Sequence, residues 1–310
     1  MILTVTANAA IDKRYVLERF GVGNVNRVKS CQANAGGKGI NVARVASIVG
    51  ERMTATGFLG GHAGKFISER VEARGIRSDF VWCEGESRTC INIYDEVTGE
   101  QTEFLEPGFT VTKEDCARLI EKYRTILPDC RVVTISGSTP AGAGAELYRE
   151  LILEAEEAGK PVILDTSGRL LEDCLSARPT MIKPNIDEIR QLTGRPMNSR
   201  EAILAAAKDL HHEGIGIVVI SLGSKGSLVS CDEGVFDVKV PKIDAVNTVG
   251  CGDSMIAGFA VGMSRGLPVT EMVRLASAVS AANAMRMETG FVVMDDVNRL
   301  LPQIEIRKIR

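Results

Sequence analysis

The chain has 310 residues, of which 45% are hydrophobic and 25% are charged, and its formal net charge is -3. These values are typical of a globular protein. The chain is slightly acidic and lacks the excess of basic residues that would favour nucleic acid as its main partner. No apolar run approaches a membrane span, and the first residues show no signal-peptide pattern. The eight cysteines are scattered without a C-x-x-C pair, which indicates reduced thiols in a cytoplasmic protein rather than disulfides or structural zinc.

Short apolar, β-branched runs recur along the chain and predict strands. These runs are residues 2–6, 54–58, 131–136, 161–165, 180–183 and 216–221. Helical patterns separate most of them; for example, Val42, Val45, Ala46 and Val49 recur at the spacing of one buried helix face. Strands that alternate with helices predict an α/β fold with a mainly parallel sheet covered on both sides. Ligands of such sheets gather at the carboxyl ends of the strands.

Two segments interrupt this alternation. Residues 13–32 contain no convincing helix, and residues 89–106 read as two alternating strands around a turn at 96–100. Strands with too little apolar area for a core of their own usually cover something else. We therefore expect segments 13–32 and 88–108 to form a small lid over the strand ends, which would also offer a homodimer surface; an ordinary surface hairpin is the alternative. Residues 1–310 are expected to form a single domain, because neither repeats nor linkers interrupt them.

Several common catalytic motifs are missing from the sequence. There is no G-x-x-x-x-G-K-[ST] and no G-x-G-x-x-G after the first strand, so neither a P-loop nor a dinucleotide fingerprint is present. H-E-x-x-H and G-x-S-x-G are also absent, which disfavours a zinc protease or a serine hydrolase. Phosphate chemistry in this chain would need another scaffold.

Residues 245–259, A-V-N-T-V-G-C-G-D-S-M-I-A-G-F, contain the ingredients of an anion site beside a base. The N–H groups of Gly250, Cys251 and Gly252 can approach a phosphate closely, and the helix that follows adds its positive N-terminal end. Asp253 in the first turn is expected to stay ionised in this field and to accept a proton from an attacking hydroxyl. A tight turn with an acidic helix cap is the plainer interpretation of this motif alone.

A second glycine-rich stretch, N-A-G-G-K-G-I-N at residues 34–41, precedes a clear helix. Asn34, Lys38 and Asn41 in this stretch favour recognition of a polyol or sugar phosphate, although a flexible loop before a helix is the alternative. Asp12 follows the first strand in N-A-A-I-D, where a carboxylate could accept hydrogen bonds from two sugar hydroxyls.

Six motifs in this order resemble those of the ribokinase-like carbohydrate kinases of the phosphofructokinase B group, over essentially the full length of the chain. They are N-A-A-I-D at 8–12, G-G-K-G-I-N at 36–41, S-G-S at 136–138, K-P-N at 183–185, S-L-G with Gly226 at 221–226, and N-T-V-G-C-G-D at 247–253. The resemblance implies a three-layer α/β/α fold with a small β-strand lid. It also implies a kinase that uses ATP and Mg²⁺, with a monovalent cation as a further cofactor of the family.

By this resemblance, Asp253 is the catalytic base and Gly250, Cys251 and Gly252 form the anion hole. The residues implied for the sugar are Asp12, Gly37, Lys38, Asn41 and Ser138. Those implied for the nucleotide are Lys183, Asn185, Ser221, Gly223, Gly226 and, near the adenine, Asn283. Asn185 and Glu188 also resemble the N-x-x-E element of the family, which holds the metal through water; a helix N-cap with an acidic first turn is the alternative.

Arg27 and Arg88 lie in the two predicted lid segments and, with Lys38, would bind a phosphate already present on the substrate; solvated lid charges are the alternative. The chain resembles the 1-phosphofructokinase and tagatose-6-phosphate kinase branch. We therefore expect it to convert a ketohexose monophosphate, tagatose 6-phosphate or fructose 1-phosphate, to the bisphosphate. The alternatives are the same chemistry on fructose 6-phosphate, a free sugar or a nucleoside, and a non-catalytic ligand-sensing protein, which the presence of Asp253 disfavours.

Two positions depart from the pattern of this branch. Ala9 stands where proline is usual, so the segment that carries Asp12 lacks a rigid φ. Cys251 stands where alanine or serine is usual, which leaves the backbone N–H of the anion hole unchanged. We hypothesise that bulky alkylation of Cys251 blocks phosphoryl transfer.

Overall fold

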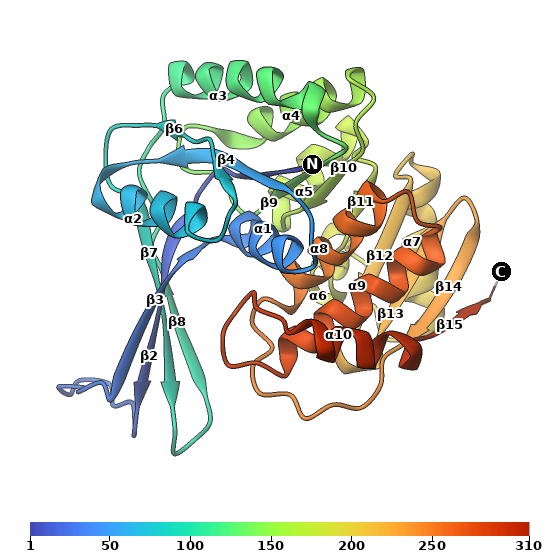
Figure 1. Ribbon diagram of the computed structural model, residues 1–310. Helices are drawn as coiled ribbons and strands as arrows, with labels where there is room; N and C mark the ends of the chain where they lie inside the picture. The colour runs from blue at the N-terminus through green and yellow to red at the C-terminus, as the bar shows by residue number, and fades with distance from the viewer. Residues whose placement is uncertain (310) are drawn as a thin grey trace.

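The computed structural model describes residues 1–309, which form two β-sheets and the helices packed around them (Figure 1). The larger sheet has eleven strands in the order β15-β14-β13-β12-β11-β10-β9-β1-β4-β5, with β6 paired to β4. Their bounds are β1 (Ile2–Thr6), β4 (Met53–Leu59), β5 (Arg77–Ser78), β6 (Val81–Trp82), β9 (Val132–Ser136), β10 (Val162–Asp165), β11 (Met181–Ile182), β12 (Ile217–Ser221), β13 (Ser227–Cys231), β14 (Gly234–Lys239) and β15 (Glu305–Lys308). Seven neighbouring strands of this sheet, β12, β11, β10, β9, β1, β4 and β5, run parallel. This confirms the mainly parallel sheet that the sequence predicts. The antiparallel strands β13, β14 and β15 extend one edge and were not predicted.

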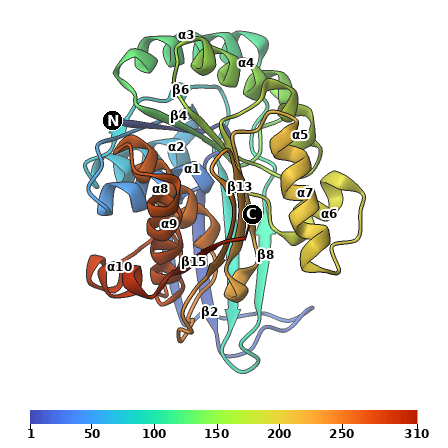
Figure 2. The ribbon, with the colours of Figure 1, turned by 90° about the vertical axis from the view of Figure 1, so that its right-hand side faces the viewer.

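Helices cover both faces of this sheet, and the two layers are visible from the side in Figure 2. One layer contains α1 (Lys38–Ile48), α2 (Gly61–Glu72), α8 (Cys251–Ser264), α9 (Val269–Ala284) and α10 (Met294–Leu300). The other contains α3 (Lys113–Ile126), α4 (Gly144–Glu157), α5 (Gly168–Cys174), α6 (Ile186–Thr193) and α7 (Arg200–His212). None of the helices within residues 1–309 is long and apolar enough to cross a membrane.

Each face of the sheet has its own apolar core, because successive side chains of a strand point to opposite sides. On β1, Ile2 packs into the core under α1, α8 and α9, whereas Leu3 and Val5 pack into the core under α3 and α4. Burial of one such side chain stabilises the fold by roughly 1.5–3 kcal/mol. A strand buried on both faces reads as a continuous apolar run, which is why the sequence identifies β1 so clearly.

The smaller sheet has four strands, β2 (Ala10–Leu17), β3 (Ser30–Gly36), β7 (Arg88–Asp95) and β8 (Gln101–Leu105), in the order β3-β2-β7-β8. It projects away from the main body of the molecule (Figure 1). We call it the lid sheet. Its strands β2 and β3 extend beyond the predicted segment 13–32. Asp12 therefore lies within a strand rather than in a loop, and residues 34–36 end a strand rather than forming a flexible loop.

Helices α8 and α9 pack unusually closely, and two glycines of α8 permit this contact. A Cβ atom at Gly258 would lie 2.5 Å from the Cα atom of Ala276, and one at Gly262 would lie 2.9 Å from the side chain of Met272. Because the obstacle at Gly258 is backbone, it cannot move aside as a flexible side chain could. This contact fixes the position of α8, and with it the position of the residues at its N-terminus.

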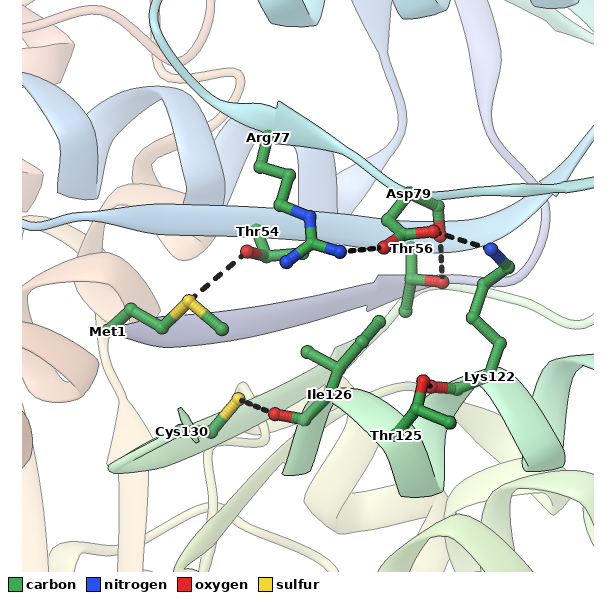
Figure 3. A network of polar contacts seen from close by, with 9 residues as sticks. All are labelled: Met1, Thr54, Thr56, Arg77, Asp79, Lys122, Thr125, Ile126 and Cys130. Carbon is green, nitrogen blue, oxygen red and sulfur yellow. Dashed lines mark hydrogen bonds and ion pairs between the residues drawn. The ribbon is translucent and has the colours of Figure 1, made fainter. Parts of the chain in front are cut away.

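A polar network ties α3 to the β4–β5 edge of the large sheet (Figure 3). Asp79 forms ion pairs with Arg77 and Lys122, and its carbonyl oxygen accepts a hydrogen bond of 2.7 Å from the hydroxyl of Thr56. None of these residues lines either of the cavities described below. The network therefore connects elements of the scaffold outside these two cavities.

Candidate active site

Two cavities meet at the N-terminus of α8. Val249, Gly250 and Asp253 line a cavity of about 550 Å³, which we call the acceptor cavity. Thr248, Cys251 and Gly252 line a cavity of about 680 Å³, which we call the nucleotide cavity. The turn at residues 248–253 is therefore a wall that both cavities share.

The backbone of this turn needs glycine at position 250. Gly250 has a φ of 80°, and a Cβ atom there would lie 2.8 Å from the methyl group of Thr289 and 2.9 Å from the nitrogen of Gly290. Both the left-handed conformation and the lack of space exclude other residues. The following N–H groups start α8, whose positive end favours an anion at this position.

Most residues predicted to bind the sugar line the acceptor cavity, although they come from the lid sheet, α1 and the end of β9. The cavity brings together Asp12, Gly37, Lys38, Asn41, Arg88 and Ser138. Arg27 is the exception, because it lies in the exposed segment between β2 and β3 and does not line this cavity. Arg14, which sequence reasoning missed, lines the cavity instead; it lies two residues after Asp12, on the same face of β2.

Asp253 is buried, with 7% of its surface exposed, and the Nδ2 atom of Asn41 donates a hydrogen bond of 2.9 Å to its Oδ2 atom. Burial raises the pKa of Asp253 to about 6, although Lys38 and the hydrogen bond from Asn41 act in the opposite direction. The carboxyl group is therefore still mostly ionised at neutral pH, but its pKa is above the ordinary value because desolvation outweighs the favourable charges. The Oδ1 atom of Asp253 has no hydrogen-bond partner within residues 1–309 and is free to meet a ligand.

Asp12 has a similar environment. Burial raises its pKa to about 6, and the charge of Arg44 is the largest opposing influence. A Cβ atom on Gly36 would lie 2.0 Å from the Oδ2 atom of Asp12, so the glycine of the neighbouring strand makes room for this carboxylate. Arg44 was not predicted as a site residue, although it follows the G-G-K-G-I-N motif by one helical turn.

One buried carboxylate, Asp165, holds a lysine from each cavity. Its Oδ2 atom lies 3.2 Å from the Nζ atom of Lys38, and its Oδ1 atom lies 3.6 Å from the Nζ atom of Lys183. Burial alone would raise the pKa of Asp165, but the two lysines lower it by a larger amount. The pKa of Asp165 is therefore below its ordinary value. The same pairing raises the pKa of Lys38. Sequence reasoning missed Asp165, and its only signal was its place at the carboxyl end of the predicted strand 161–165.

The nucleotide cavity has a polar edge and a largely apolar wall. Lys183, Ser221, Gly223 and Gly226 line the polar edge, so the structure brings together four of the residues predicted for the nucleotide. Apolar side chains complete the wall, among them Val240, Ile243, Met255 and Ala281. A flat aromatic base stacks well against such a wall, whereas phosphates suit the polar edge and the N-terminus of α8.

Asn283, which was predicted to lie near the adenine, has no access to the nucleotide cavity, although its neighbours Ala281 and Ala284 line it. Asn283 is fully buried and does not line the nucleotide cavity. Its Nδ2 atom donates to the carbonyl of Val249 at 3.0 Å and to the sulfur of Cys251 at 3.4 Å, and its Oδ1 atom accepts from the hydroxyl of Ser254. Asn283 therefore supports the turn from behind.

Asn185 and Glu188 form a reciprocal capping box at the start of α6. The Oδ1 atom of Asn185 accepts from the backbone N–H groups of Asp187 and Glu188, and the Oε2 atom of Glu188 accepts from the N–H of Asn185 at 2.8 Å. Within residues 1–309 no three His, Cys, Asp or Glu residues cluster as a direct metal site. One oxygen of Glu188 stays free of the capping box, and its charge acts on Lys38. These residues therefore fit a metal held through water, not a cage of direct protein ligands.

Comparisons with known proteins identify the family and the fold of the chain. The sequence pattern of the pfkB family carbohydrate kinases matches residues 3–295. A tagatose-6-phosphate kinase of Staphylococcus epidermidis is 38% identical over 312 aligned residues, which cover 100% of both chains. Among solved structures, a possible 1-phosphofructokinase from Thermotoga maritima is 30% identical with a TM-score of 0.91 and 100% coverage of both chains. Phosphofructokinase-2 from Escherichia coli, in complex with potassium, is 27% identical with a TM-score of 0.91 and covers 97% of this chain and 98% of its own. The chain therefore belongs to the pfkB family of carbohydrate kinases.

Proposed function

We propose that this carbohydrate kinase transfers the γ-phosphoryl group of ATP to a hydroxyl of a ketohexose monophosphate, tagatose 6-phosphate or fructose 1-phosphate, and forms the bisphosphate. The observation that carries this proposal is the turn at residues 248–253, which lines both cavities. A donor in one cavity and an acceptor in the other would meet at the N–H groups of Gly250, Cys251 and Gly252. The tagatose-6-phosphate kinase relative, similar over its whole length, supports the substrate class.

In this reaction Asp253 would accept the proton of the attacking hydroxyl through its free Oδ1 atom. A carboxylate with a pKa of about 6 is a stronger base than an ordinary carboxylate, yet it is mostly ionised near neutral pH. The N–H groups at the start of α8 would stabilise the charge on the transferring phosphoryl group. Positioning and charge stabilisation supply most of the rate in phosphoryl transfer, because little covalent chemistry is asked of the protein.

Lys38 and Lys183 would flank the transferring group, one from each cavity, while Asp165 holds both ammonium groups in place. Glu188 and Asn185 would hold Mg²⁺ through water. When bound, this ion would neutralise charge on the β- and γ-phosphates. A monovalent cation is a further expected cofactor, which the potassium complex of the Escherichia coli relative supports.

We assign the phosphate already present on the acceptor to Arg88. Its Nε atom donates to the carbonyl of Asn8 and its Nη1 atom to the carbonyl of Glu106, each at 3.1 Å. The Nη2 group makes no hydrogen bond within residues 1–309, so it is available to an anion in the acceptor cavity. Arg27 lies outside this cavity and is not part of the assignment.

Residues 1–310 are proposed to be a single kinase domain in which the lid sheet closes the acceptor cavity. Large apolar side chains are exposed on the lid sheet and its connecting segments, which supports a homodimer formed through the lid. They are Val22, Val25, Val28, Val97, Phe104 and Leu105. The eight cysteines are free thiols, which supports the predicted cytoplasmic location.

An ADP-release screen tests the activity. Purified protein with ATP and Mg²⁺ is assayed against tagatose 6-phosphate, fructose 1-phosphate, fructose 6-phosphate, fructose and adenosine. We expect the highest kcat/KM with one of the first two substrates. A higher kcat/KM with fructose or adenosine would show that the substrate class is wrong. Absence of turnover with all five, together with measurable binding of a sugar phosphate, would favour the non-catalytic alternative.

A further inference from the structure

Arg44 of α1 is a buried cation without a close counter-ion. Only 3% of its surface is exposed, and no carboxylate within residues 1–309 lies within ion-pair distance of its guanidinium group. Burial of an arginine is rare unless the charge is paired, because desolvation of the charge costs several kcal/mol. Burial accordingly lowers the pKa of Arg44 to about 10. Glu288, Asp12 and Asp253 act on this charge only from beyond ion-pair distance, so the direct contacts of Arg44 are hydrogen bonds.

The guanidinium group of Arg44 joins three segments around the acceptor cavity. It donates to the carbonyl of Ala35 at the end of β3 and to the carbonyl of Thr289, which follows α9, the latter at 2.8 Å. It also donates to the Oδ1 atom of Asn41 at 3.4 Å, one turn earlier on α1. The planar fork of arginine can serve these three acceptors at fixed angles, whereas the ammonium group of lysine cannot.

Arg44 and Asp253 contact opposite ends of the Asn41 amide and together fix which way it faces. With its oxygen directed toward Arg44, the Nδ2 atom of Asn41 donates to the Oδ2 atom of Asp253 at 2.9 Å. A flipped amide would bring its oxygen against the carboxylate, and two acceptors repel each other at that distance. Space is also limited, because a Cβ atom on Gly290 would lie 3.0 Å from the side chain of Asn41.

We propose that Arg44 is a positioning residue for phosphoryl transfer. It orients the amide of Asn41 so that Asn41 holds the Oδ2 atom of Asp253 and leaves the Oδ1 atom for the acceptor hydroxyl. This inference rests on the proposed function for its kinetic consequence, but the orientation of Asn41 and its effect on Asp253 do not depend on that function.

The kinetic test compares Arg44→Lys, Asn41→Ala and the double variant. Arg44→Lys keeps the charge but loses the fork, so we expect kcat to fall ~10–100-fold, as for a misplaced catalytic group, with the KM for ATP unchanged. In the Asn41→Ala background the same change should lower kcat only slightly further, because Arg44 acts through Asn41. An unchanged kcat in Arg44→Lys, or a full additional loss in the double variant, would overturn the proposal.

A second measurement is independent of activity. The free energy of unfolding is measured against pH for a chain with Asp253 and for the same chain with Asp253→Asn. The pH dependence of the difference between the two reports the pKa of Asp253 in the folded protein. The comparison is made once with Arg44 and once with Arg44→Lys. The groups that act on Asp253 are Asn41, Lys38, Asp165, Lys183 and Arg44; the first four keep their identity in Arg44→Lys, and position 44 keeps its positive charge. If Arg44→Lys removes the hydrogen bond from Asn41, the pH at which this stability difference is half complete should rise by about 0.5–1 pH unit. We call this pH the midpoint. A midpoint that stays in place contradicts the proposal even if the protein proves to have no kinase activity.

Two controls separate positioning from general damage. Arg131→Lys alters another arginine that donates to a backbone carbonyl, that of Ser264 at 3.2 Å, but it precedes β9 at the opposite end of the strands. It should leave kcat unchanged.

If Arg44→Lys fails to fold, Asn41→Asp serves instead. The new carboxylate keeps an acceptor for Arg44 and faces Asp253 with a second negative charge, so the midpoint should rise by more than about 1 pH unit. An unshifted midpoint in that variant also overturns the proposal.

Discussion

Asp253 is the residue on which the proposed chemistry depends most directly. Asp253→Asn keeps the shape of the side chain and can still accept the hydrogen bond from Asn41, but it cannot accept a proton. We expect kcat to fall ~10²–10⁴-fold while ATP and the sugar phosphate still bind. Initial rates and calorimetric titration of both ligands check this. Turnover near the wild-type rate would show that Asp253 is not the base.

The same substitution should stabilise the protein, with a defined pH dependence. Because burial raises the pKa of Asp253 from 3.8 to about 6, ionisation of this group costs the folded state free energy. That cost is absent below about pH 4 and complete above about pH 6, so Asp253→Asn should be the more stable protein at neutral pH, by ~1–3 kcal/mol. Thermal unfolding of the wild type and of Asp253→Asn, at pH 4 and at pH 7.5, measures this stability difference. A stability difference that is larger at the lower pH would contradict the sign.

Cys251 contributes its backbone to the anion hole, while its side chain lines the nucleotide cavity. Cys251→Ser should therefore keep kcat within a few-fold of wild type. Burial raises the pKa of the Cys251 thiol, so alkylation should be slow near neutral pH and faster in alkaline buffer. A bulky alkyl group on Cys251 should then block turnover. Bound ATP should slow the alkylation, and Cys251→Ser should stay active in the presence of the alkylating reagent. Full activity of protein shown by mass spectrometry to be modified at Cys251 alone would contradict this.

At the scale of elements, the contact between α8 and α9 is the most sensitive. A methyl group at Gly258 would lie 2.5 Å from the Cα atom of Ala276, so Gly258→Ala forces the two helices apart. Overpacking of this kind costs typically 1–3 kcal/mol, which outweighs the roughly 1 kcal/mol that alanine gains over glycine in a helix. Denaturant unfolding measures the loss. Gly64→Ala in α2 is the control, because a Cβ atom there meets its nearest neighbours at 3.1–3.3 Å; it should cost less stability than Gly258→Ala.

Several elements could be predicted locally, and others could not. Strands such as β1 and β9 are buried on both faces and read as continuous apolar runs, so pattern alone identifies them. β15 is a short, mostly exposed strand whose pairing with β14 depends on a distant part of the chain, and no local pattern marks it. Asn185 and Glu188 form the capping box that starts α6, and local pattern alone could not separate this role from the proposed contact with a metal-bound water.

At the scale of the whole molecule, the lid sheet predicts an association between two chains. Phe104 lies on β8 and is 50% exposed, whereas its neighbours Glu103 and Leu105 line the acceptor cavity. Because side chains alternate along a strand, Phe104 faces away from the cavity. We expect the wild type to be a dimer and Phe104→Glu to shift it toward the monomer. Light scattering after gel filtration measures the mass. A monomeric wild type, or a dimer that the substitution does not weaken, would place the interface elsewhere.

The acceptor cavity itself exists only in the folded molecule. Asp12 reaches it from the lid sheet, Asn41 from α1, Ser138 from the segment after β9 and Asp253 from α8. The motifs around Asp12, Asn41 and Asp253 were recognisable, because glycines and polar residues next to apolar runs are local patterns. Asp165 and Arg44 were missed, because a single acid at a strand end or a single arginine on a helix carries no such pattern.

The sequence by itself determined the fold class, the family resemblance and the turn that carries Asp253, since strand and helix periodicity and glycine-rich motifs are encoded by neighbouring residues. Only the tertiary structure decided that Arg27 lies outside the acceptor cavity, that Asn283 supports the turn from behind, and that burial raises the pKa of Asp253 to about 6. These properties depend on burial and on hydrogen bonds between residues far apart in the chain. Desolvation in particular is set by everything packed around a group, and for Asp253 it outweighs the opposing effects of Lys38, Lys183 and the hydrogen bond from Asn41.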